Sequence, residues 1–274
     1  MTVFERKTKL AFFGLAVASG AMVAASAASI AFEPETPEPP AQAALIVPSP
    51  SRDSAQSGET ANASHMRALV SNIWNDVNAV WQTMPAMGMG RGPVPHLNLV
   101  PKVSAAHCYG IYISSGPVYC TGNGTVFASL DELMRLANRL GAKADAGLAF
   151  LIAHEFGHHI QLVNGRFGIV RHKILEEPSR QREISLRFEL EADCLAGVWA
   201  ARSRTFAAGE TTRSDIVASL DLMGDDTVQV AAFGAADPST FWHGTSVQRA
   251  HWFMTGLHAS DDLEACSALT ADRF

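Results

Sequence analysis

The chain has 274 residues, enough for one sizeable domain with additional segments, and 47% of them are hydrophobic against 18% charged. Its net charge of −6 and the lack of a basic stripe along the sequence argue against a nucleic-acid partner. The composition therefore indicates a globular protein that also carries an apolar segment.

The apolar segment occupies the first 32 residues, where basic side chains at positions 6–9 precede an uncharged run over residues 10–32. This arrangement is typical of an exported signal peptide or of an N-terminal membrane anchor. An Ala-Ser-Ala tripeptide at residues 25–27 fits a cleavage site, whereas the length of the run would span a bilayer, so both alternatives stay open. Either one predicts a cell-envelope location, anchored in the membrane or released to the periplasm.

Residues 33–64 carry several prolines with Ser, Ala, Glu and Gln between them. Such a composition cannot bury enough apolar surface to offset the entropy lost on ordering. We therefore expect a disordered linker here and a folded domain over residues 65–274.

The N-terminal part of this domain shows one helix followed by short strands. Apolar side chains recur at helical spacing over residues 66–84, which predicts an amphipathic helix. Gly122-Asn123-Gly124 is a hairpin signal between two β-like runs, so we expect a small antiparallel sheet. The strands are expected at residues 96–100, 110–114, 118–121 and 125–128.

The C-terminal part is helical by its periodicity and its capping residues. Capping boxes beginning at Ser129 and Thr245 mark the starts of two helices. The sequence predicts a charged connector at residues 166–178 and helices at residues 130–141, 145–163, 183–204, 215–223 and 246–257. Together with the strands, these helices predict an α+β domain that is mostly helical.

Four cysteines in an exported domain suggest two disulfides, for which three connectivities exist. We expect Cys108 to pair with Cys120, closing a short loop around the hairpin. Cys194 and Cys266 would then join the C-terminal tail to the helix at residues 183–204. The spacing of the cysteines does not fit a structural zinc site.

The most informative motif is His154-Glu155-Phe156-Gly157-His158. Its two histidines are four residues apart on a predicted helix, so they project from one face. Neutral imidazole is a preferred zinc ligand, and Glu155 is about a quarter of a turn from His154, where it can take a proton from the attacking water. The motif predicts a zinc hydrolase with His154 and His158 as ligands and Glu155 as general base.

A second acidic motif offers the third ligand. Catalytic zinc usually takes three protein ligands, and His, His and Glu form one standard set. Glu189 and Asp193 are spaced i, i+4 and share a helix face, so Glu189 can bind the metal while Asp193 accepts a hydrogen bond from a ligating histidine. Glu191 is the alternative ligand, but it points to another side of the helix.

Three further polar residues need an interpretation. His243 directly precedes a predicted helix, and it either donates to the developing oxyanion or serves as a structural turn histidine. His159 faces away from the ligand side of its helix, which favours a supporting or core role over ligation. Arg249 is expected to form an internal salt bridge.

With these motifs, the chain resembles the putative neutral zinc metallopeptidase family of bacterial envelope proteins, within the wider zincin group. The resemblance covers about residues 66–270 and is carried by residues 118–120, 153–161, 189–200, 224–226, 243–249, 252–253 and Gly256. It implies a zincin-like peptidase domain whose Zn2+ ligands are His154, His158 and Glu189. The E-x-x-x-D pattern of Glu189 and Asp193 is also similar to glutamate zincins, which supports Glu189 over Glu191.

The predicted function is therefore zinc-dependent hydrolysis of a peptide or protein substrate, in which Glu155 passes the proton of water to the leaving amine. By analogy with zincins, residues 125–128 or the neighbouring strand line the cleft, where an extended peptide can pair with them. Two alternatives stay open: a zinc-binding envelope scaffold or adaptor without catalysis, and an amidase acting on cell-wall peptides.

Overall fold

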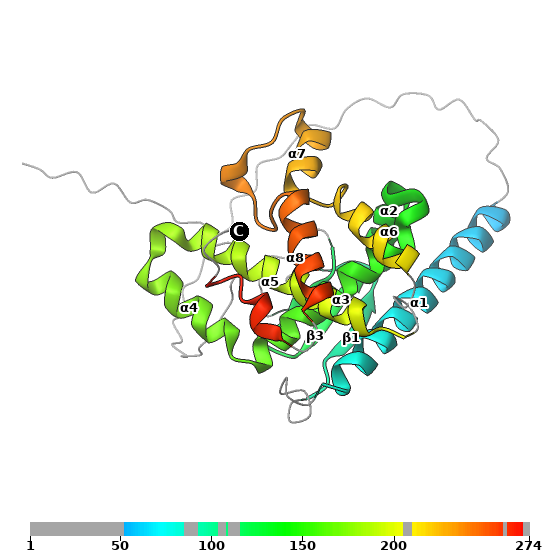
Figure 1. Cartoon of the computed structure of the whole chain (residues 1–274). Coiled ribbons are helices and arrows are strands. Elements are labelled where there is room, and N and C mark those ends of the chain that lie inside the picture. Colours follow the sequence, from blue (N-terminus) through cyan, green and yellow to red (C-terminus); the bar gives the residue numbers. More distant parts are fainter. Residues whose placement is uncertain are drawn as a thin grey trace, which may run out of the picture.

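The structure is a computed structural model that describes residues 52–84, 93–103, 108, 116–204, 210–259 and 262–270. Within these ranges the chain is mostly helical with one small mixed sheet, which confirms the predicted α+β class (Figure 1). The predicted segment at residues 1–32, most of the expected linker and the expected strand at residues 110–114 lie outside the described residues. Among the helices that can be described, none is long and apolar enough to cross a membrane.

The sheet has the strand order β1-β3-β2, formed by β1 (His96–Val100), β2 (Val118–Cys120) and β3 (Thr125–Ser129). β2 and β3 form the predicted antiparallel hairpin, but β1 runs parallel to β3. The expectation of an antiparallel sheet was therefore wrong for β1. β3 lies between β1 and β2, so the three strands do not form a simple meander.

The helices account for most of the domain. The helices that carry the candidate site were predicted close to their observed positions. The expected N-caps of two helices, Ser129 and Thr245, are also present. The eight α-helices in the described ranges are α1 (Arg52–Gln82), α2 (Leu130–Leu140), α3 (Ala144–Val163), α4 (Arg166–Glu176), α5 (Gln181–Arg202), α6 (Glu210–Leu220), α7 (Asp225–Phe233) and α8 (Ser246–His258).

Two helices occupy segments that were expected to be irregular. α1 begins at Arg52, inside the expected linker, because no proline follows Pro50 there to interrupt a helix. α4 replaces the expected charged connector. Its Phe167, Val170 and Ile174 recur at helical spacing and pack against one small apolar cluster, a pattern that the charges between them conceal.

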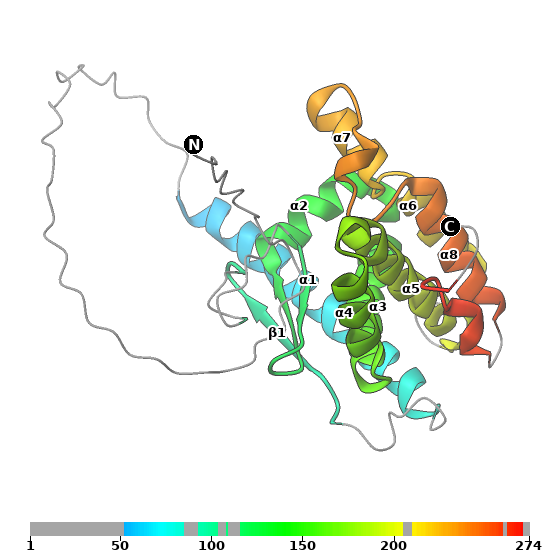
Figure 2. The same ribbon diagram turned by 90° about the vertical axis from the view of Figure 1, so that its left-hand side faces the viewer.

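The boundaries around α6 and α7 also differ from expectation. α6 begins at Glu210 instead of residue 215. Gly224 does not close that helix; it is the N-cap residue of α7, a helix that was not expected. α7 projects from the body of the domain in both views and has no buried residue, so little packing restrains it (Figures 1 and 2).

α3 is the central helix of the domain. Its Phe150, Ile152 and Phe156 are completely buried, and it packs against α1, α2, α5 and α6. The sheet and α1 lie on one side of α3, with α5 and α8 on the other (Figure 2). A helix that is apolar nearly all round is stable only in such a position, which places its histidines inside the protein.

α5 and α8 form the closest helix pair, because glycines replace side chains where they cross. A Cβ atom on Gly256 would collide with the carbonyl oxygen of Cys194, and one on Gly197 would collide with that of Phe253. The Cys194–Cys266 disulfide then ties the C-terminal turn, η6 (Leu263–Cys266), to α5. This pairing and the Cys108–Cys120 disulfide were both predicted, and both are confirmed.

Candidate metal centre

Three side chains from α3 and α5 converge at one point of the interior. The Nε2 atoms of His154 and His158 each lie 3.2 Å from Oε2 of Glu189. All three donor atoms lie within 4.8 Å of one another. The i, i+4 spacing places both histidines on the face of α3 that meets α5, and Glu189 approaches from α5. The structure thus brings together the three residues that the sequence predicts as ligands.

This arrangement fits zinc. Tetrahedral zinc with bonds of about 2.0–2.2 Å requires neighbouring donor atoms to lie roughly 3.3 Å apart. The two separations of 3.2 Å match this requirement, and two imidazoles with one carboxylate are a standard catalytic donor set. Glu191, the alternative ligand, instead forms a salt bridge with Arg166 and lies outside the cluster.

A buried ion pair contacts the Nδ1 side of the His154 ring. Its Nδ1 lies 2.7 Å from Oδ1 of Asp193, and Asp193 also accepts two hydrogen bonds of 2.9 Å from Arg249. When Nε2 binds a metal, Nδ1 carries the proton and donates a hydrogen bond to Asp193, which fixes the imidazole tautomer. The predicted salt bridge of Arg249 is therefore confirmed, and its partner is the residue that orients a ligand.

The charges of the cluster favour an ionised Glu189. Burial raises the pKa of Glu189, but the charge of His158 and hydrogen bonds from both histidines lower it well below its usual value. Burial lowers the pKa of His154, but hydrogen bonds and charges of Asp193 and Glu189 raise it to about 10. A metal that binds here must therefore displace a proton from His154.

Glu155 lies beside the cluster and is held by the sheet. Its side chain is buried, and Oε2 accepts a hydrogen bond of 2.7 Å from the backbone N–H of Tyr119 in β2. Burial raises the pKa of Glu155, although the charges of His158 and His154 oppose this rise. A raised pKa suits a group that must accept and return a proton near neutral pH.

His159 does not take part in the cluster. Its Nδ1 lies 2.8 Å from the Tyr119 hydroxyl, and its ring is buried against Phe156. Burial lowers its pKa to about 4, so the ring stays neutral at physiological pH. The structure supports the predicted core role for His159.

His243 stands at the rim of the cluster. The centroid of its ring is 6.4 Å from that of His154, and its side chain is 46% exposed. Asp225 Oδ2 accepts backbone N–H bonds from Trp242, His243 and Gly244, while Asp225 Oδ1 lies 3.6 Å from His243 Nδ1. Asp225 thus contacts both the backbone of the turn and the His243 ring, and this ring lies near that of His154.

Three residues at the site lie in segments that carry the family resemblance, but the sequence interpretation gave them no role. Tyr119 and Asp225 act through backbone hydrogen bonds between distant segments, for which the sequence contains no spacing signal. Gln161 lies with Oε1 2.7 Å from Nδ1 of His158. Its position three residues after His158 is a helical-face spacing, and this signal could have identified it.

Two known proteins are similar to this chain in sequence. "Uncharacterized protein YpfJ" of Escherichia coli (strain K12) is 37% identical over 150 residues, which are 53% of this chain and 52% of YpfJ. "Uncharacterized protein Rv2575" of Mycobacterium tuberculosis (strain H37Rv) is 29% identical over 199 residues, 68% of this chain and 65% of that protein. The chain thus spans about half to two thirds of the length of these relatives.

No solved structure gives a significant match to the chain. A family model described as "Putative neutral zinc metallopeptidase" matches residues 41–269, which include every residue of the candidate metal centre. The chain therefore belongs to the putative neutral zinc metallopeptidase family.

Proposed function

We propose that the protein is a zinc-dependent peptidase that hydrolyses peptide bonds, with its metal bound by His154, His158 and Glu189. The observation that carries this proposal is the convergence of both histidine Nε2 atoms on Oε2 of Glu189, 3.2 Å from each. Zinc, when bound, supplies a Lewis acid that polarises a carbonyl group and makes water acidic near pH 7. Three protein ligands leave one coordination position open, whereas structural zinc sites usually fill all four with protein.

Glu155 is the general base in this proposal. The Tyr119 amide holds Oε2 of its carboxylate, which leaves Oε1 to accept a proton from the attacking water. The same carboxyl then returns the proton to the leaving amine. Because Glu155 is buried, its charge acts in a low-dielectric setting where proton transfer to it is favourable.

His243 is proposed to stabilise the negative charge that develops on the carbonyl oxygen. A hydrogen-bond donor at this point stabilises the negative charge of the transition state more than it stabilises the bound substrate. It therefore lowers the activation barrier and leaves substrate binding little changed. The proximity of its ring to His154 and the fixed turn around Asp225 support this role.

β2 is proposed to bind the substrate backbone. β3 was one of two strands expected to line the cleft, but it is the central strand and its backbone pairs on both sides. β2 is an edge strand, and no described strand pairs with its second edge. Because Tyr119 in β2 contacts Glu155, a peptide that pairs with this edge would pass close to the general base.

Substitution of the general base tests the proposal. Zinc-loaded wild-type protein should cleave members of a peptide library analysed by mass spectrometry. Glu155→Gln should retain its zinc affinity and melting temperature but cleave at background level, because an amide cannot accept the proton. Glu176→Gln, an exposed change on α4, is the matched control and should cleave like wild type.

Two results would contradict the proposal. Wild-type protein that binds zinc but cleaves no peptide, while Glu155→Gln fully complements a deletion strain, would favour the scaffold. Cleavage restricted to cell-wall peptides would instead identify the amidase.

A further inference from the structure

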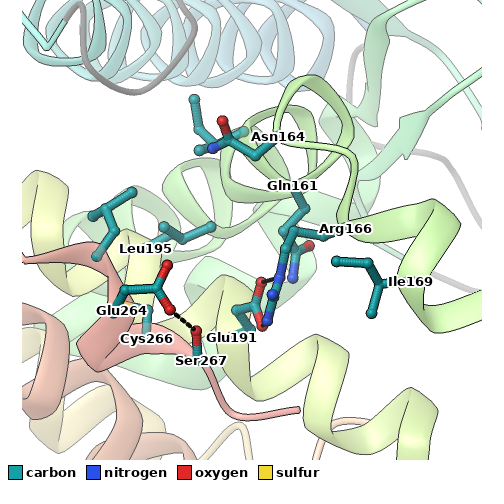
Figure 3. Close-up of a pocket in the computed structure, with 11 residues that line it drawn as sticks. Gln161, Asn164, Arg166, Ile169, Glu191, Leu195, Glu264, Cys266 and Ser267 are labelled. Carbon is teal, nitrogen blue, oxygen red and sulfur yellow. Dashed lines mark hydrogen bonds and ion pairs between the residues drawn. The ribbon is translucent and has the colours of Figure 1, made fainter. Parts of the chain in front are cut away.

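A pocket of about 340 Å3 opens between α3, α4, α5 and η6, beside the end of α3 that carries His158 (Figure 3). Gln161, Arg166 and Glu191 lie together on one wall of the pocket. Cys266 and Glu264 from η6 line the opposite wall. The first three residues form a polar chain that begins at a candidate zinc ligand and ends at the pocket.

Gln161 is the first member of this chain, and its amide is bonded at both ends. Oε1 lies 2.7 Å from Nδ1 of His158, and Nε2 donates to the carbonyl oxygen of Phe188 at 2.8 Å. The side chain is only 1% exposed, so water does not compete for these bonds. The bond to Phe188 fixes which end of the amide faces His158, and an amide oxygen there requires the proton of the imidazole on Nδ1.

Arg166 and Glu191 form the second part of the chain. Arg166 donates from Nε and Nη2 to the two carboxylate oxygens of Glu191, at 2.7 and 2.6 Å. The Glu191 side chain is 5% exposed and lies beside the side chain of Gln161 on the same wall of the pocket. A two-bond guanidinium–carboxylate pair has one geometry, so it restricts where the Gln161 amide can lie.

We propose that Gln161 is the positioning residue of His158 and that the Arg166–Glu191 pair holds Gln161 in place. This inference rests on the proposed zinc site. The hydrogen bond to Nδ1 turns the imidazole so that the lone pair of Nε2 points at the metal, as Asp193 does for His154. Each candidate histidine ligand then has a hydrogen-bond partner at Nδ1. For His154 this partner is the carboxylate of Asp193, and for His158 it is the amide of Gln161.

Gln161→Met tests the first link, because methionine keeps the length of the side chain and removes both hydrogen bonds. The zinc dissociation constant of the full chain, measured by competition with a chromophoric chelator, should rise about 10–100-fold. Asn164→Ala, on the same pocket wall but without contact to a ligand, should leave it unchanged. Wild-type affinity in Gln161→Met would overturn the proposal.

Two substitutions that move a carboxylate from residue 191 to residue 161 distinguish a positioning role of Gln161 from a general loss of packing. Gln161→Glu keeps a hydrogen-bond acceptor for His158, but the new carboxylate would lie next to that of Glu191. Because the two negative charges repel each other, this variant should bind zinc weakly. Adding Glu191→Gln removes that repulsion, so the double variant Gln161→Glu, Glu191→Gln should bind zinc more tightly than Gln161→Glu alone. Absence of this rescue, in variants that melt like wild type, would overturn the proposal.

The second link predicts that the effects of the two sites are not additive. Glu191→Gln alone should weaken zinc binding, but it should add little in the background of Gln161→Met. Glu183→Gln is the matched control. It removes the negative charge from the salt bridge with Arg180 at the start of α5 and should bind zinc normally. Full additivity would show that the Arg166–Glu191 pair does not act through Gln161.

These readouts do not depend on peptide cleavage. Protein that binds zinc with the predicted pattern but cleaves nothing would contradict the proposed function and retain this inference. Wild-type protein that binds no zinc would overturn both.

Discussion

At the scale of single residues, Asp193 connects the metal centre to the core. Its carboxylate contacts His154 and Arg249, and Arg249 donates in turn to the carbonyl oxygen of Met223 in the turn that follows α6. All of these groups are buried, so neither charge can be removed without leaving the other uncompensated. A residue that contacts a candidate zinc ligand thus also takes part in a buried ion pair of the core.

Glu189 and Asp193 should respond differently to substitution. Glu189→Ala removes a ligand and should abolish zinc binding at micromolar protein. Asp193→Asn keeps the volume and an acceptor for His154, so zinc affinity should fall by about 10–100-fold. It should also lower the melting temperature, because Arg249 loses its counter-charge. Chelator competition and thermal melts measure both effects; two small, equal losses of affinity would place the third ligand elsewhere.

His243→Ala should slow the chemical step and leave metal binding intact. If its ring stabilises the oxyanion, kcat should fall about 10²–10³-fold while KM and zinc affinity change little. Steady-state kinetics on one cleaved peptide measure this. His172→Ala removes an exposed histidine on α4 and should behave like wild type. If kcat is unchanged in His243→Ala, the residue is a turn histidine and has no part in the reaction.

The candidate ligands were predictable from the sequence because helix spacing and the resemblance to glutamate zincins point to the same residues. The i, i+4 spacing of His154 and His158 fixes their common face, and the same spacing of Glu189 and Asp193 separates Glu189 from Glu191. The contacts of Tyr119 and Asp225 join segments far apart in the chain. No local pattern encodes such contacts, so only the folded structure reveals them.

At the scale of elements, the metal centre depends on how closely α8 packs against α5. Arg249 on α8 reaches Asp193 on α5 only because Gly197 and Gly256 let the two backbones approach. The Cys194–Cys266 disulfide lies near the same crossing. α5, the helix that carries Glu189, is therefore held in place from the side opposite α3.

Gly256→Ala should separate these helices. Its Cβ would collide with backbone that cannot move without shifting a helix, and overpacking of this kind costs about 1–3 kcal/mol. The melting temperature should fall by about 2–4 °C for each kcal/mol lost. Gly168→Ala, at a helical position where an added Cβ meets nothing, should melt at or above the wild-type temperature. Equal behaviour of the two variants would contradict the close packing.

The elements show where a single sequence is informative and where it is not. The apolar run of α3, the helical pattern of α5 and the capping box of α8 located these three helices. α4 was missed because its apolar stripe is narrow and charged residues separate its members. The strands β1, β2 and β3 were found, but the parallel pairing of β1 with β3 depends on a crossover whose path the sequence does not specify.

At the scale of the whole molecule, two disulfides link segments of the domain that lie apart in the sequence. The four cysteines form two disulfides, and such bonds persist in oxidising compartments. We propose that the domain works in the cell envelope, to which the basic and apolar residues at positions 1–32 direct it.

Fractionation of the native host combined with non-reducing peptide mapping tests this location. The protein should be recovered in the envelope fraction with Cys108 linked to Cys120 and Cys194 linked to Cys266. A mature chain that starts near residue 28 would identify a cleaved signal peptide, and an intact N-terminus in the membrane pellet would identify an anchor. Recovery in the cytosol with four free thiols would contradict export.

Anomalous diffraction at the zinc absorption edge, measured on zinc-loaded crystals, tests the proposed zinc site between α3 and α5 most directly. A single strong peak should lie about 2.0–2.2 Å from Nε2 of His154, Nε2 of His158 and Oε2 of Glu189. No other described residue should lie within bonding distance of the peak. A peak elsewhere in the domain, or none after zinc reconstitution, would contradict the account.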